Sequence, residues 1–297
     1  MIIEQIKEII SNTIRIKNSE YYSCIIGKNP STTARSPKLW NAAFKKHSIK
    51  IKMFALDIEQ KNVSKVFNLL RSDKNFIGGS VTVPYKETIF KLLKNNLTKE
   101  TKKIGAVNSL FRDYNSNLIG TNTDGEASLK SFTKKFGYSK NKKITILGLG
   151  GAGKAVNAFF SSNFLDVKII SRNKNDRKYC KPFNTKWHHW KNLNNEIVDR
   201  DVIINCTSIG FDKKINESPI KEEVISKLKR NAIIFDIIYN PHQTKLISLA
   251  KKYNYRTMNG ADMNLEQAVI AFNYTNNIIK NRSVSITKNA MKKSTHS

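Results

Sequence analysis

A glycine-rich loop is the first segment whose residue types and spacing point to a defined chemistry. It follows the apolar run 144–147 and precedes a helical pattern over 151–162. In this order the first glycine permits a tight turn, the second lets the backbone approach a pyrophosphate, and the third packs the helix on the strand. The helix N-terminus adds partial positive charge. We therefore expect a dinucleotide to bind at the loop residues Gly148, Gly150, Gly151, Ala152 and Gly153.

The end of the next strand decides which dinucleotide fits. NAD would require an acidic residue there, about 20 residues after the loop, to bond a ribose hydroxyl. The sequence instead has Ser171 and Arg172, with Arg177 nearby. A guanidinium pairs with a phosphate and gains nothing from a bare hydroxyl, so NADP is favoured. The alternative is an ordinary solvated arginine after a strand.

Three further polar segments also follow apolar strand patterns. They are 80–86 (SVTVPYK), 105–109 (GAVNS) and 120–125 (GTNTDG). In open α/β sheets, ligands bind where the strands end, so these segments are candidates for a substrate site.

Together with the glycine loop, the runs VTVPYKE, GAVN and NTDG make the chain resemble the shikimate/quinate dehydrogenase family, from about Gly27 to Phe272. The resemblance implies an N-terminal open α/β substrate domain completed by the last helix, with a Rossmann-type NADP-binding domain between them. It also implies NADPH-dependent, reversible reduction of 3-dehydroshikimate to shikimate, a step of chorismate and aromatic amino acid biosynthesis.

By position, Lys86 and Asp124 match the catalytic pair of that family. Hydride delivery to a ketone leaves an alkoxide that needs a proton, which a lysine can donate while the carboxylate holds its ammonium group. The alternative for Lys86 is a surface lysine at a helix start. The resemblance assigns the cyclic hydroxy-carboxylate substrate to Ser36, Thr82, Asn108, Tyr239 and Gln267. It assigns the cofactor, besides the loop and the residues after it, to Thr207 and Gly260.

Two substrate positions depart from the family pattern. Ala34 stands where the first serine of S-x-S-P is usual, and Ser80 replaces an asparagine. Arg35 would compensate if it took the carboxylate in a bidentate pair; otherwise it is a solvated loop residue. A diverged relative acting on quinate, aminoshikimate or another cyclic hydroxy acid therefore stays open, as does a non-catalytic ligand-binding protein on the same fold.

The alternation of apolar runs and helical patterns predicts an α/β protein of two domains. We expect the substrate domain over 1–123, the NADP domain over 124–259, and a returning helix with a basic, frayed tail over 260–297, frayed from 288. Strands are predicted at 22–26, 51–56, 76–83, 143–147, 167–170, 202–205 and 233–237, a hairpin over 105–118, and helices at 2–12, 37–47, 63–70, 85–93, 151–162 and 265–280.

Composition excludes some classes of protein and leaves others open. With 52 Lys+Arg against 23 Asp+Glu, the net charge is +29, a basic balance that is typical of proteins that bind nucleic acid. The lysines are spread along the chain, and Lys, Asn and Ile share A/T-rich codons, so we expect no nucleic acid. We expect no membrane span, no metal at the Trp187–Trp190 run, and a cytoplasmic monomer or homodimer, since three cysteines suit a reducing compartment.

Overall fold

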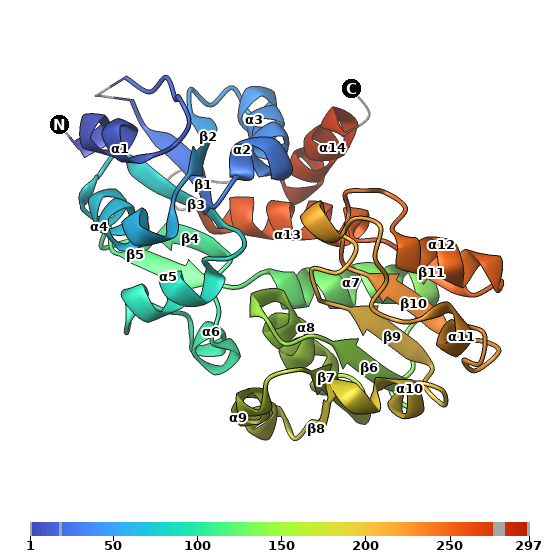
Figure 1. Cartoon of the computed structure of the whole chain (residues 1–297). Coiled ribbons are helices and arrows are strands. Elements are labelled where there is room, and N and C mark those ends of the chain that lie inside the picture. Colours follow the sequence, from blue (N-terminus) through green and yellow to red (C-terminus); the bar gives the residue numbers. More distant parts are fainter. Residues whose placement is uncertain (1, 18–19, 276–282, 296–297) are drawn as a thin grey trace. The chain divides into compact units, whose positions relative to one another are not determined.

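The computed structural model describes residues 2–17, 20–275 and 283–295. The chain divides into two compact α/β units, one made of Met1–Thr123 with Gln267–Ser297 and the other of Asp124–Glu266 (Figure 1). We expected the return to the first unit at residue 260. It occurs at Gln267, inside α13 (Ala261–Tyr274), because this continuous helix begins in one unit and ends in the other.

The first unit is built on a mixed sheet with strand order β2-β1-β3-β4-β5. The first three strands along the chain run parallel, and the last two form an antiparallel hairpin against β3. The hairpin turn is held by Asp113, whose carboxylate accepts the backbone N–H groups of Asn115 and Asn117 at 2.9 and 2.8 Å. The strands are β1 (Tyr22–Gly27), β2 (Lys52–Asp57), β3 (Phe76–Val81), β4 (Ser109–Arg112) and β5 (Leu118–Thr121).

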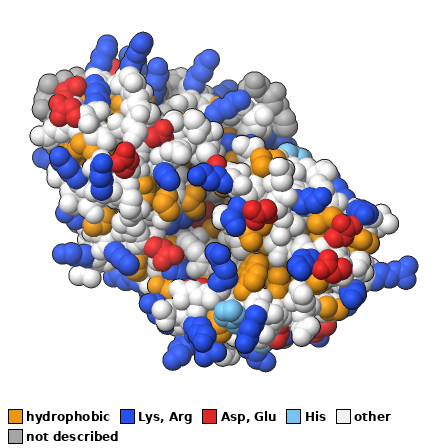
Figure 2. All heavy atoms as spheres, in the orientation of Figure 1, with side chains coloured by type: hydrophobic (Ala, Val, Ile, Leu, Met, Phe, Trp, Pro, Cys, Tyr) orange, Lys and Arg blue, Asp and Glu red, His pale blue; other side chains and the backbone are white. Residues whose placement is uncertain are grey.

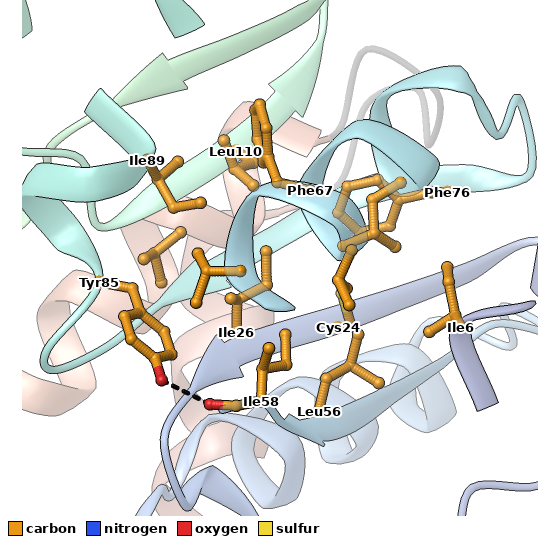
Figure 3. Packing of buried hydrophobic residues seen from close by; sticks show 14 of the residues in the cluster. Ile6, Cys24, Ile26, Leu56, Ile58, Phe67, Phe76, Tyr85, Ile89 and Leu110 are labelled. Carbon is orange, nitrogen blue, oxygen red and sulfur yellow. Dashed lines mark hydrogen bonds between the residues drawn. The ribbon is translucent and has the colours of Figure 1, made fainter. Parts of the chain in front are cut away.

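Helices of this unit bury the apolar faces that their sequence periodicity predicts. In α1 (Ile2–Ile9) the buried side chains are Ile3 and Ile6. Figure 3 shows Ile6 in one apolar cluster with strand residues such as Cys24 and with Phe67 of α4 (Val63–Ser72). The other helices are α2 (Pro30–Thr33), α3 (Ser36–Lys46), α5 (Lys86–Leu93) and α6 (Lys99–Ile104).

The basic tail differs from expectation. We expected residues 288–297 to be frayed, and this is wrong for the part up to Ser294, which belongs to helix α14 (Val284–Ser294). The helix is stabilised because it buries Thr287 and Met291 and packs on α3. The Thr287 hydroxyl also hydrogen-bonds His47 Nε2 at 2.8 Å. Of the closing helix expected over 265–280, the part after residue 275 lies outside the described residues.

The second unit is a fully parallel sheet in the order β11-β10-β9-β6-β7-β8. The two apolar runs predicted as doubly buried strands are β9 and β10, and every residue of both is buried. The strands are β6 (Lys143–Leu147), β7 (Asp166–Ser171), β8 (Lys186–His189), β9 (Val202–Asn205), β10 (Ile233–Asp236) and β11 (Arg256–Met258).

Connections of this sheet bring several loops to the same edge. Its longer helices are α7 (Asp124–Phe136), α8 (Gly151–Ser161) and α12 (Lys245–Lys252), with short helices α9 (Arg177–Cys180), α10 (Leu193–Glu196) and α11 (Glu222–Ile225). Because all the strands are parallel, the segments that follow them lie at one carboxyl edge, where ligands of such sheets bind. Among the described residues, no helix is both long and apolar enough to cross a membrane.

Candidate functional site

The glycine loop lies between the central strand β6 and helix α8, as predicted. Gly148 adopts φ +86°, a left-handed conformation that favours glycine. A Cβ on Gly153 would collide with the carbonyl oxygen of Gly148, so the third glycine permits the helix to pack on the turn. A Cβ on Gly150, in contrast, would meet no atom within 4 Å. The loop therefore leaves open space at its second glycine, the position where a pyrophosphate must approach the backbone, and it fits a dinucleotide.

Ser171 and Arg172 follow directly at the end of the neighbouring strand β7. The Ser171 side chain is buried, and its Oγ accepts a hydrogen bond from Trp187 Nε1 at 2.8 Å. Arg172 is exposed, as is Arg177 at the start of α9. The guanidinium carbon of Arg177 lies 4.7 Å from the centroid of the Trp187 ring. The strand end and the segment after it thus carry a hydroxyl and two basic side chains, residue types suited to a phosphate monoester.

Thr207 belongs to a buried polar network behind the carboxyl ends of β9 and β10. Its hydroxyl donates to Asn205 Oδ1 at 2.7 Å, while Asn205 Nδ2 donates to Asp236 Oδ1 at 3.0 Å. Thr244 Oγ1 donates to the other oxygen of Asp236 at 2.7 Å. Burial raises the pKa of Asp236 to about 6, although these hydrogen bonds act in the opposite direction. The network holds the loop that carries Thr207 at the same edge as the glycine loop.

Tyr239 and Gly260 lie after two strands of the same sheet, β10 and β11. Tyr239 follows β10 and is half-buried. The backbone N–H of Gly260 donates to Ile238 O at 3.0 Å, and a Cβ on Gly260 would collide with Ile237 O. Glycine is therefore needed for the close approach of the chain after β11 to the chain after β10.

In the first unit, Asn108 and Gln267 lie together with a residue that we had not assigned, Thr123. Asn108 Oδ1 accepts the backbone N–H of Thr123 at 2.8 Å, and Asn108 Nδ2 donates to Thr123 Oγ1 at 3.0 Å. Asn108 Nδ2 also lies 3.4 Å from Gln267 Oε1. These buried neutral amides and a hydroxyl suit the hydroxyl groups of a polyol. The signal for Thr123 was its place in the NTDG run, beside Asp124.

Thr82 and Lys86 lie after β3 in the same unit. The backbone N–H of Thr82 donates to Ile26 O at 2.8 Å, which ties the segment to the end of β1. Lys86 begins α5 and its carbonyl accepts Val107 N–H at 2.9 Å, next to Asn108. Between them, Tyr85 is buried and its hydroxyl donates to Ile58 O (Figure 3). This anchor sets the start of the helix that carries Lys86.

The loop after β1 holds the two departures from the expected serine pattern. Ser36 is buried at the start of α3, whereas Ala34 and Arg35 are half-buried. The hydroxyls of Thr32 and Thr33 donate to Asn29 O at 3.2 and 2.7 Å, so they serve the turn of α2.

Ser80, the other departure, is buried in β3. Its Oγ has no hydrogen-bond partner among the described residues.

Positive charge is distributed over the surface. Figure 2 shows Lys and Arg side chains scattered across the visible face with acidic side chains between them. This matches the even spread of basic residues along the sequence.

A glycine loop in a fully parallel α/β unit, and a buried polar cluster in a second unit with a mixed sheet, are typical of two-domain nucleotide-dependent enzymes. The family model described as the shikimate dehydrogenase substrate binding domain matches residues 25–110. A relative named shikimate dehydrogenase (NADP(+)), from Methanococcus vannielii, is 31% identical over 276 residues, 88% of this chain and 95% of its own length.

Solved structures agree. A crystal structure of a shikimate dehydrogenase in complex with NADP+ is 29% identical, with TM-score 0.77 over 94% of this chain and 97% of that one. Shikimate dehydrogenase 1 from Peptoclostridium difficile is 26% identical, with TM-score 0.78 over 93% and 98%. This chain belongs to the shikimate dehydrogenase family, which confirms the resemblance and the expected fold class.

Proposed function

We propose that this protein is an NADP-dependent shikimate dehydrogenase, which interconverts 3-dehydroshikimate and shikimate in aromatic amino acid biosynthesis. The observation that carries the proposal is that this member of the family has both residues suited to the cofactor and residues suited to the substrate. The second unit has a glycine loop followed by Ser171 and Arg172. The first unit has the cluster of Asn108, Thr123 and Gln267.

The cofactor is held by residues at the carboxyl edge of the second unit. The backbone of the loop receives the pyrophosphate, in the open space at Gly150. Ser171, Arg172 and Arg177 bind the 2′-phosphate, because a charged phosphate can accept hydrogen bonds from all three side chains and a ribose hydroxyl cannot. Thr207, Tyr239 and Gly260 line the side toward the nicotinamide. When bound, NADPH supplies the hydride for the ketone carbon.

Lys86 is the proton donor in the direction of reduction. Its ammonium group protonates the ketone oxygen as negative charge develops there, and it takes the proton back from shikimate in the reverse direction. Asp124 is the second member of the assigned catalytic pair and accepts a hydrogen bond from a ring hydroxyl. Thr82, Asn108 and Gln267 bind the remaining hydroxyls, while Ser36 donates to the carboxylate. Tyr239 is assigned to the same substrate.

The test is turnover by the purified protein. NADPH formation is followed with shikimate, quinate and related cyclic acids, each with NADP+ and with NAD+. The proposal predicts turnover of shikimate and a clear preference for NADP+. Absence of turnover with every acid would refute the enzyme, whereas preference for another acid would refute only the substrate.

The second candidate is a relative that prefers quinate, aminoshikimate or another cyclic hydroxy acid. It is favoured by Ala34, which offers no hydroxyl to a carboxylate, and by Ser80, whose hydroxyl is buried within the sheet. Retention of Lys86 and Asp124 argues against a non-catalytic protein.

We further propose a cytoplasmic monomer or homodimer whose partners are the two small molecules. A reducing compartment suits the three cysteines, which form no disulfide with one another.

A further inference from the structure

The geometry points to Trp187 as a positioning residue that determines the preference for NADP over NAD. Trp187 lies on the edge strand β8, which pairs in parallel with β7, and Ile169 and Ser171 pair with Trp187 and His189. The indole and Ser171 therefore share one face of the sheet. This inference rests on the proposed function, because it concerns the residues assigned there to the 2′-phosphate.

One contact of the indole orients the hydroxyl of Ser171. Trp187 Nε1–H donates to Ser171 Oγ at 2.8 Å. An indole nitrogen can only donate, so Ser171 must be the acceptor in this pair. The hydroxyl hydrogen is then directed away from Trp187 and is available to a second acceptor. A charged phosphate oxygen is a strong acceptor for this hydrogen, whereas the oxygen of a ribose hydroxyl is a weaker one.

The other contact places a cation. Arg177 lies over the indole face, with 4.7 Å between the guanidinium carbon and the ring centroid. Stacking on an aromatic face holds a guanidinium while its N–H groups remain free to bind at their edges. A single side chain thus fixes both a hydroxyl and a guanidinium that we assign to the phosphate.

The surroundings of the indole are suited to an anion. An open hollow of about 640 Å³ borders Trp187, and Lys174, Arg177 and Lys191 line it. His189, at the carboxyl end of β8, lines it as well. The nearby carboxylate of Glu196 bonds His188 Nδ1 and Lys168 Nζ, at 2.8 and 2.9 Å. His188 also lines the hollow, so this carboxylate lies near it and is paired with His188 and Lys168.

The test uses two nucleotides that differ only in the phosphate in question. Binding of adenosine 2′,5′-bisphosphate and of adenosine 5′-monophosphate to the full chain is measured by calorimetry. Trp187→Phe removes the N–H but keeps a ring for Arg177, so the bisphosphate is expected to bind about three- to tenfold more weakly, the range of one hydrogen bond. The monophosphate is expected to change less than about twofold.

Two further variants separate positioning from a general structural effect. In a Ser171→Ala background the hydroxyl is gone, so adding Trp187→Phe should weaken bisphosphate binding less than about twofold. Trp190→Phe is the matched control. Trp190 follows the end of β8 and packs against the apolar core, so this change should leave the binding of both nucleotides unaffected. Thermal unfolding of each variant verifies that it is folded.

The outcomes are distinct. A loss confined to the bisphosphate in Trp187→Phe supports the inference. Equal losses of affinity for both nucleotides, or no loss, overturn the inference. The proposed NADP site still stands in that case if the wild-type protein prefers the bisphosphate. If the wild-type protein itself shows no preference for the bisphosphate, the assigned phosphate site and this inference both fail.

Discussion

Asn108 holds Thr123 by two hydrogen bonds from a single side-chain amide. Its Oδ1 accepts the backbone N–H of Thr123 at 2.8 Å, and its Nδ2 donates to the Thr123 hydroxyl at 3.0 Å. Thr123 also donates to the backbone oxygen of Gln267 at 3.3 Å, so the three residues form one buried group. Thr123 directly precedes Asp124, the first residue of α7, so its hydrogen bonds help to fix where that helix begins.

Thr123→Val tests this relationship. The change keeps the shape of the side chain but leaves the Asn108 amide without that acceptor, so the free energy of unfolding should fall by about 1–3 kcal/mol. The KM for shikimate should rise several-fold, with little change in NADP affinity. Denaturant unfolding and steady-state kinetics measure both.

Thr145→Val is the matched control. Thr145 is buried in β6, but its hydroxyl has no hydrogen-bond partner among the described residues. Its loss should be neutral or slightly stabilising. An equal loss of stability in the two variants would contradict the importance of the Asn108–Thr123 pair.

Lys86→Ala removes the assigned proton donor. We expect kcat to fall by about 10²–10⁴, the usual contribution of general acid–base catalysis, with NADP binding unchanged. Lys91→Ala, on the exposed side of the same helix, should retain full turnover. An active Lys86→Ala protein would require another proton donor.

Arg172→Ala removes a charge assigned to the 2′-phosphate. Loss of a hydrogen bond to a charged group amounts to about 1.5–3 kcal/mol, so the Kd for NADP+ should rise by about 10- to 100-fold while that for NAD+ changes little. Lys178→Ala, a nearby exposed cation on α9, serves as the control. Equal weakening of both nucleotides would remove Arg172 from the phosphate site.

Ala34→Ser restores the serine that is usual in this loop. If the substrate carboxylate is held there, the new hydroxyl should lower the KM for shikimate about tenfold, as one charge-assisted hydrogen bond predicts. The same substitution at Ala42, in the middle of α3, should have no effect on KM. An unchanged KM in Ala34→Ser would indicate that the carboxylate is bound elsewhere or that another acid is the substrate.

Asp236 should make stability depend on pH. Burial raises its pKa from 3.8 to about 6 in the folded protein, so the folded chain binds this proton more tightly than the unfolded chain. The contribution is therefore complete below about pH 4 and is lost as the pH rises through 6. A difference of about two pKa units corresponds to about 3 kcal/mol.

Asp236→Asn isolates that contribution, since an amide remains uncharged and its oxygen can still accept a hydrogen bond from Asn205 Nδ2. The difference in unfolding free energy between wild type and variant, measured from pH 4 to 7, should move in favour of the variant as the pH rises. A difference that does not vary with pH would show that Asp236 keeps an ordinary pKa.

Local patterns in the sequence were sufficient for much of the fold. The apolar runs of β9 and β10 have too few polar positions to face solvent, and both strands are fully buried. Gly148 was predictable because its turn needs a left-handed residue. The half-polar strand β8 was not predicted, because Lys186 and the two histidines interrupt the alternation of apolar and polar residues that indicates a strand. The helical tail α14 was missed because its stability comes from packing on α3, which no local pattern reveals.

By itself, the sequence determined the α/β alternation of most strands, the family and the residue types of the site, because these depend on local spacing and on motifs along the chain. Only the tertiary structure decided which distant side chains meet. Asn108 reaches Gln267 across 159 positions, and Trp187 reaches Ser171 from a neighbouring strand. The first contact depends on how helix α13 packs on its unit, and the second on strand order and register, neither of which is set by neighbours in the sequence.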